Sequence, residues 1–166
     1  NEHHIDTTLW GQGSTKTVEH LLKEIEEGDS VLTVDNSGNL LRHTSVTTAE
    51  IFYEDENHQR YYLVEDRQVF TDGRGRKRNM KESVAEKMKA DEDPEKAIAR
   101  GIAEELGISG EMPITTLNTV EETIESKSYP GLMTHFIRHN FRVLLQKDQF
   151  KPEGYIEVQK DKTTYF

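Results

Sequence analysis

The sequence contains no cysteine among its 166 residues, which excludes disulfide bonds, thiolate metal sites and cysteine nucleophiles. It has no run of about 18 apolar residues, the length that a membrane-spanning helix needs. Its N-terminus is polar and lacks the apolar core of a signal peptide. We therefore expect no membrane partner and a cytoplasmic protein, although a trimmed organelle-targeting segment would leave no trace.

Apolar residues are also scarce, at 33% of the chain, with a mean hydropathy of -0.80. The length still suffices for one domain with a buried core. We predict a single domain over residues 1–166, in which residues 1–13 form a flexible or extended segment. The formal net charge of -10 argues against broad binding to a nucleic-acid backbone. It suits a site that gathers divalent cations, although solvated surface accounts for most of these carboxylates.

Hydrophobic spacing predicts two helices, at residues 14–27 and 93–106. Gly28 ends the first, while Pro94 opens and Gly107 closes the second. The apolar face of the second helix consists of Ile98, Ile102 and Leu106. Runs rich in β-forming residues lie at 31–34, 40–42, 45–53, 60–65, 68–71, 116–122 and 134–145, and residues 155–159 are a further strand or the start of a final helix. Strands before, between and after two helices predict a mixed α/β fold.

Residues 92–108 carry the most specific motif. Glu92 precedes Arg100 by eight residues, and the sequence from Arg100 to Ile108 reads Arg-Gly-Ile-Ala-Glu-Glu-Leu-Gly-Ile. This spacing resembles the Nudix box, the signature of enzymes that cleave nucleoside diphosphates linked to another group. The resemblance implies a Nudix-like α/β/α sandwich with a mixed sheet. It also implies a structural pair between Arg100 and Glu92, and Mg²⁺ or Mn²⁺ as the cofactor.

The box is degenerate at two positions. Gly101 stands where the family has the first of three glutamates, and Glu86 stands where it has its opening glycine. Glu104 and Glu105 remain as catalytic and metal-binding candidates, with a solvated helix face as the alternative. Glu86 either supplies a replacement metal ligand or is a surface residue. A Gly101→Glu substitution is expected to restore the carboxylate without loss of helix stability, because Glu is the better helix former.

Family members often place another acidic residue late in the chain, facing the metals. By its position, Glu157 is the candidate for this third catalytic carboxylate. Four other glutamates compete for the role, namely Glu153, Glu121, Glu122 and Glu125.

The only dense basic run precedes the box and contains Arg74, Arg76 and Arg78. Guanidinium groups suit bidentate phosphate contacts, so these residues are candidates for substrate binding, with a solvated loop as the alternative. Tyr129, in a turn at residues 128–131, either stacks on a base or packs in the interior.

Two functional hypotheses follow from the resemblance. The first is a domain that binds a nucleoside diphosphate derivative or an RNA 5′ end, with weak or lost hydrolysis and a metal held weakly or only together with nucleotide. The second is an active metal-dependent pyrophosphohydrolase with a rebuilt metal site. A protein partner, or a purely structural interaction domain, is a further alternative, since a fold does not fix a function.

Overall fold

The computed structural model describes residues 3–78, 80 and 82–166. The chain divides into two compact units. The first contains Asn1–Val46, Lys87–Asp93 and Thr119–Arg138, and the second contains Thr47–Glu86, Pro94–Asn118 and His139–Phe166. The single domain expected from the sequence stays a prediction. In the described part of the chain, no helix has the length and apolar character to cross a membrane.

The first unit contains the helix α1 (Val18–Glu26) and the strand β1 (Val31–Val34), which pairs antiparallel with the start of β2 (Leu40–Glu54). The helix begins later than predicted, because the Thr17 side chain accepts a hydrogen bond from the His20 amide and so caps it there. Of the predicted N-terminal segment, residues 1 and 2 lie outside the described residues. Trp10 of that segment donates a hydrogen bond to the Pro130 carbonyl at 2.8 Å.

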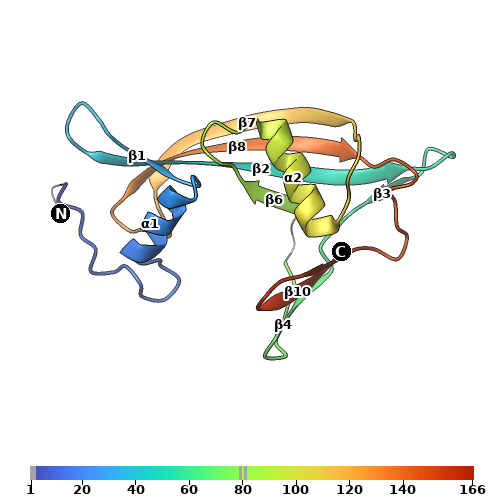
Figure 1. Ribbon diagram of the computed structural model, residues 1–166, viewed down its shortest axis with the longest axis horizontal. Coiled ribbons are helices and arrows are strands. Elements are labelled where there is room, and N and C mark those ends of the chain that lie inside the picture. Colours follow the sequence, from blue (N-terminus) through green and yellow to red (C-terminus); the bar gives the residue numbers. More distant parts are fainter. Residues whose placement is uncertain (1–2, 79, 81) are drawn as a thin grey trace. The chain divides into compact units, whose positions relative to one another are not determined.

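The larger sheet has the strand order β1-β2-β8-β7, and β3 and β6 also pair with β2. The remaining strands of this sheet are β3 (Arg60–Tyr62), β6 (Val84–Lys87), β7 (Ile114–Glu125) and β8 (Met133–Leu144). In the second unit, Thr48 of β2 donates to Asn140 of β8 at 2.6 Å, and Arg142 donates to Glu50 at 3.0 Å. The residue numbers of these bonded partners increase in the same direction along both strands, so β2 and β8 run parallel, as their arrowheads show in Figure 1. The sheet is therefore mixed, as predicted.

The helix α2 (Pro94–Leu106) lies over this sheet in the second unit (Figure 1). Ile98 and Ile102 are fully buried and Leu106 nearly so, and they pack against sheet residues such as Ile51 and Val143. The predicted apolar face is confirmed. Gly107 follows with a φ of +67°, a left-handed conformation that glycine adopts without strain and that ends the helix.

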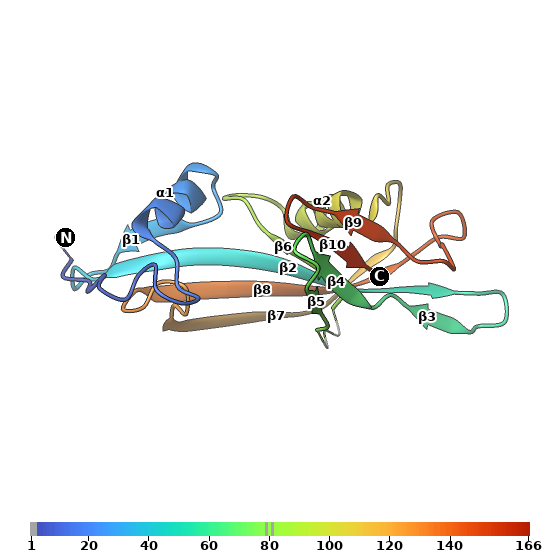
Figure 2. The same cartoon turned by 90° about the horizontal axis from the view of Figure 1, so that it is seen from below.

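A second, smaller sheet in the second unit has the order β5-β4-β10-β9 (Figure 2). Its strands are β4 (Arg67–Phe70), β5 (Gly75–Arg76), β9 (Ile156–Val158) and β10 (Lys162–Tyr165), and every pairing is antiparallel. The strand β9 also contacts α2. The α/β fold with a mixed sheet and two helices is confirmed, but this small sheet was not predicted as a unit.

Candidate functional site

A cavity in the second unit is lined by residues from α2, from both sheets and from the loops between them. Glu105 enters it from α2, Glu157 from β9, and Glu65 and Arg78 from segments flanking β4 and β5; its volume is about 170 Å³. We call it the acidic cavity. Two of the three predicted catalytic residues, Glu105 and Glu157, therefore lie together.

The carboxylates of the acidic cavity repel one another. Burial, followed by the nearby charges of Glu157 and Glu86, raises the pKa of Glu105 to about 8. Burial also raises the pKa of Glu157, which Lys162 opposes and Glu86 and Glu104 reinforce. Glu105 therefore holds a proton at neutral pH unless a positive charge enters the cavity.

Glu86 occupies the space beside Gly101. Gly101 is buried on α2, and a β-carbon at this position would lie 2.9 Å from Cβ and 3.3 Å from Oε2 of Glu86. The Glu86 side chain, and with it a carboxylate, therefore lies directly against the helix at this glycine. The prediction that Gly101→Glu costs no helix stability considers helix propensity alone; in the structure, the new side chain would collide with Glu86.

Arg100 joins two of these carboxylates. Its Nη1 lies 3.0 Å from Oε1 of Glu86 and 3.6 Å from Oε1 of Glu104, which is exposed. The predicted partner, Glu92, belongs to the first unit, where its carboxylate accepts a hydrogen bond from the Lys89 amide at 2.8 Å. The Arg100–Glu92 pair stays a prediction. The structure shows in addition an ion pair between Arg100 and Glu86, which was not predicted.

The basic run divides into three separate contacts. Arg78 makes a two-pronged contact with Glu65, whose carboxylate is almost fully buried, and so lines the acidic cavity. Arg76 donates from Nε to Gln68 at 2.9 Å, and Gln68 lines the same cavity. Arg74 pairs with Asp72 at 2.6 Å and is 76% exposed. Arg78 thus lines the acidic cavity directly. Arg76 contacts it only through Gln68, and Arg74 lies in solvent.

Tyr129 lies in the first unit and has no exposed surface. Its ring packs against Trp10, with 5.1 Å between the ring centroids, and beneath the Arg42 guanidinium. This burial leaves no face of the ring for a nucleobase. The substrate-binding assignment of Tyr129 is therefore corrected to the packing role that the sequence left as its alternative.

Sequence reasoning missed Glu65 and Ser83. Glu65 ends a predicted strand, and nothing in the sequence marks it as buried; its partner Arg78 allows its burial. Ser83 is buried and lines the acidic cavity, and its Oγ has no hydrogen-bond partner within the described part of the chain. Burying a hydroxyl without a hydrogen-bond partner costs free energy, and a polar ligand in the cavity would remove this cost by bonding to the hydroxyl.

The donor set fits a hard divalent cation in kind, because carboxylate oxygens are the ligands that Mg²⁺ and Mn²⁺ prefer. The raised pKa of Glu105 fits as well, since a cation would offset the crowding of negative charge. Among residues 3–78, 80 and 82–166, however, no three His, Asp or Glu side chains converge closely enough to hold a metal ion. The carboxylates are neighbours, not a formed coordination shell.

No family model and no curated protein sequence matches this chain. Solved structures with a similar fold include the NUDIX domain of Shewanella oneidensis NrtR complexed with ADP ribose. It is 13% identical, with 75% of this chain and 72% of that chain covered and a TM-score of 0.42. Another is the C. elegans Ap4A hydrolase, which is 11% identical, with 74% and 79% covered and a TM-score of 0.37.

Proposed function

We propose that the second unit binds the diphosphate of a nucleoside diphosphate derivative at the acidic cavity together with a divalent cation, and hydrolyses it weakly or not at all. The observation that carries this proposal is that Glu86 fills the space beside Gly101, with its Oε2 3.3 Å from the β-carbon position of residue 101. This contact keeps a third carboxylate beside Glu104 and Glu105. Because Arg100 pairs with Glu86 at 3.0 Å, that carboxylate attracts a cation less strongly than an unpaired one.

Glu105 lines the acidic cavity, while Glu86 and Glu104 lie near it and pair with Arg100. These three carboxylates would hold Mg²⁺ or Mn²⁺ only together with phosphate oxygens of the ligand, because they do not form a coordination shell by themselves. The cation, when bound, neutralises charge on the diphosphate and polarises the attacking water. Glu105 must release its proton to become a ligand, which makes cation binding dependent on pH. Glu157, whose pKa is raised by burial, is the candidate base, because a proton acceptor works best with a pKa closer to neutrality. Arg78 and Ser83 face the same cavity and supply donors for phosphate oxygens.

An active pyrophosphohydrolase is the second candidate. It is favoured by the short distance, 3.3 Å, between Oε2 of Glu86 and the β-carbon position of residue 101, because Glu86 then replaces the family's glutamate in space as well as in charge. An RNA 5′ end presents the same phosphate chemistry. The net charge of -10 favours a small nucleotide over a long polyanion.

Binding and turnover of ADP-ribose and Ap4A, with Mg²⁺ or Mn²⁺, test both candidates. We expect cation-dependent binding of one of them, lost in Glu105→Gln, and slow or absent turnover. The matched control is Glu111→Gln, at an exposed glutamate outside the cavity, which should behave like the unaltered protein. Fast turnover that is abolished by Glu105→Gln and by Glu86→Gln would establish the rebuilt hydrolase instead. No binding of either nucleotide, with or without a cation, would reject both.

A further inference from the structure

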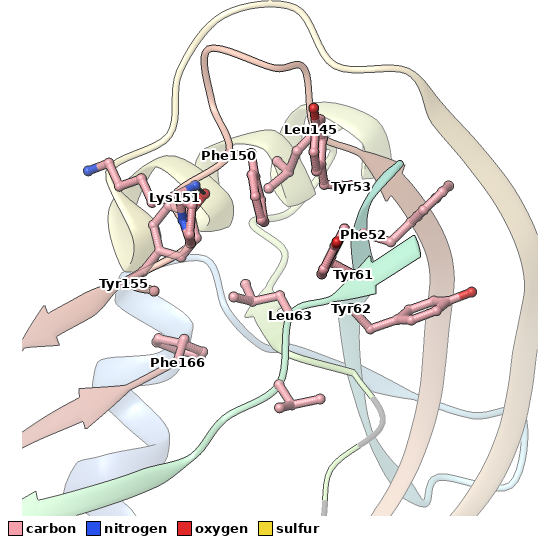
Figure 3. A pocket seen from close by; sticks show the side chains of 13 residues that line it. Phe52, Tyr53, Tyr61, Tyr62, Leu63, Leu145, Phe150, Lys151, Tyr155 and Phe166 are labelled. Carbon is pink, nitrogen blue, oxygen red and sulfur yellow. Dashed lines mark hydrogen bonds between the residues drawn. The ribbon is translucent and has the colours of Figure 1, made fainter. Parts of the chain in front are cut away.

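A second cavity in the second unit is lined mainly by aromatic side chains and has a volume of about 220 Å³ (Figure 3). Tyr53 and Tyr61 come from the hairpin of β2 and β3, Phe150 and Tyr155 come from the loop before β9, and Phe166 follows β10. We call it the aromatic cavity. None of these residues belongs to the Nudix-box motif.

The rings are held in place by the strands and by one another. Tyr53 and Tyr61 are directly paired across β2 and β3, so both rings project from the same face of the hairpin. Phe150 stacks on Tyr53 with 4.2 Å between centroids and 14° between planes, and it lies 5.6 Å from Tyr61. These contacts place the rings of Tyr53, Tyr61 and Phe150 together as one aromatic wall of the cavity.

The cavity opens to solvent through apolar surface. Tyr61 and Tyr62 are each 46% exposed and Val64 is 54% exposed, although all three border the same cavity. Exposed apolar residues that gather around a concavity are typical of a ligand site, since a ligand removes their surface from water. The volume is below the range of about 300–1,000 Å³ that holds whole drug-sized ligands. It therefore suits one ring system and not a complete nucleotide.

The aromatic cavity adjoins the acidic cavity. Phe166 lines both of them, and the chain passes from one to the other between Val64, which lines the aromatic cavity, and Glu65, which lines the acidic one. A ligand with a planar ring at one end and a diphosphate further along would therefore meet a matching surface at each end.

We propose that the aromatic cavity binds the nucleobase of the ligand whose diphosphate lies in the acidic cavity, an inference that rests on the proposed function. The base stacks against the wall formed by Tyr61 and Phe150. Edge-specific recognition is limited, because the Tyr155 hydroxyl is already bonded to the Lys151 amide at 3.1 Å and to the Gln149 carbonyl. Stacking is tolerant of base identity, so adenine and guanine derivatives should bind with similar affinity.

Calorimetry with ADP-ribose and with pyrophosphate, both in the presence of Mg²⁺, separates the two cavities. Phe150→Leu should weaken ADP-ribose binding by about tenfold, the usual effect of losing one base–aromatic stack, and should leave pyrophosphate binding unchanged. Tyr61→Leu, at a more exposed ring, should show the same selectivity and guards against a folding defect in Phe150→Leu. Phe70→Leu is the matched control, because Phe70 is a half-buried ring of the same unit outside both cavities.

Equal ADP-ribose affinity in the unaltered protein, Phe150→Leu and Tyr61→Leu would overturn the nucleobase assignment, while intact pyrophosphate binding would leave the proposed function in place. If pyrophosphate binds to no form, the proposed function fails, and quenching of tyrosine fluorescence by adenosine without metal tests the aromatic cavity alone. Quenching that is lost in Phe150→Leu and kept in Phe70→Leu supports this cavity as a base site. No quenching of the unaltered protein rejects it.

Discussion

Glu86 occupies the space that a side chain at position 101 would need, because a β-carbon at Gly101 would lie 2.9 Å from Cβ of Glu86. In the sequence, these residues are two unrelated departures from the Nudix pattern. In the structure, they are neighbours, because Glu86 of the strand β6 fills the space beside Gly101 of the helix α2. The two positions must therefore be altered together in any attempt to recreate the family's arrangement.

Gly101→Glu alone should destabilise the protein by about 1–3 kcal/mol, the usual cost of forcing a side chain into a filled space. The double variant Glu86→Gly/Gly101→Glu removes the collision and should recover most of that loss. Urea denaturation of both variants and of Glu86→Gly gives the coupling free energy between the two positions. Additive effects would show that the two side chains do not share this space.

The same double variant should hydrolyse ADP-ribose or Ap4A faster than the unaltered protein, because its added carboxylate would lie on the helix face that carries Glu104 and Glu105. Turnover with Mg²⁺ and with Mn²⁺ measures this change. Slower turnover by the double variant would indicate that Glu86 is the better placed ligand and would favour the rebuilt hydrolase.

Glu105 makes stability depend on pH in the metal-free protein. Its pKa is about 8 in the folded state, against an ordinary value of 4.5, so the folded state holds more protons between these pH values. The free energy of unfolding should therefore fall as the pH rises from about 4.5 to about 8. Glu105→Gln should flatten this slope in melting curves from pH 4.5 to 8.5, and exposed Glu111→Gln should retain it. An unchanged slope in Glu105→Gln would contradict the raised pKa.

Arg78 and Arg74 belong to the same basic run but should respond differently to truncation. Arg78→Ala leaves the Glu65 carboxylate, only 2% exposed, without its partner and should cost about 3 kcal/mol or more. Arg74→Ala breaks an exposed pair with Asp72 and should have little measurable effect. Denaturant midpoints compare the two variants directly, and similar midpoints would show that the contact with Glu65 adds nothing to stability.

Mg²⁺ should bind weakly to the free protein and more tightly once a nucleotide supplies phosphate oxygens. Arg100 already offsets the charge of Glu86 at 3.0 Å, and burial raises the pKa of Glu105 to about 8, so a proton competes with the cation for this carboxylate. Calorimetric titration of Mg²⁺ with and without ADP-ribose measures the difference, and Arg100→Gln should strengthen binding to the free protein. Tight binding without nucleotide would mean that the carboxylates rearrange into a full coordination shell on their own.

The sequence predicted the helix α2 and its buried face, because apolar residues at a spacing of three to four residues form one stripe on a helix. Through the resemblance to the Nudix family, it offered Glu157 as one of several candidates for a third catalytic carboxylate, and the structure places Glu157 in the same cavity as Glu105. It did not predict the small sheet, whose strands of two to four residues are too short to show a periodic pattern. The contact between Glu86 and Gly101 could not be predicted either, because it exists only after the strand β6 and the helix α2 have packed together.

The aromatic cavity could not be predicted from the sequence for a similar reason. Tyr53, Tyr61, Phe150 and Phe166 are spread over the chain and belong to no motif. Only the pairing of β2 with β3 and the return of the C-terminal strands bring them together.

The parallel pairing of β2 and β8 has a consequence for how the protein reaches this structure. Thr48 and Asn140 are 92 residues apart in the chain, so a long loop must close before the central strands of the larger sheet can align. Such non-local contacts slow folding, typically to milliseconds or seconds. During synthesis, the sheet that α2 packs on should stay incomplete until β8 has left the ribosome. Both cavities should therefore form only in the last stage of folding.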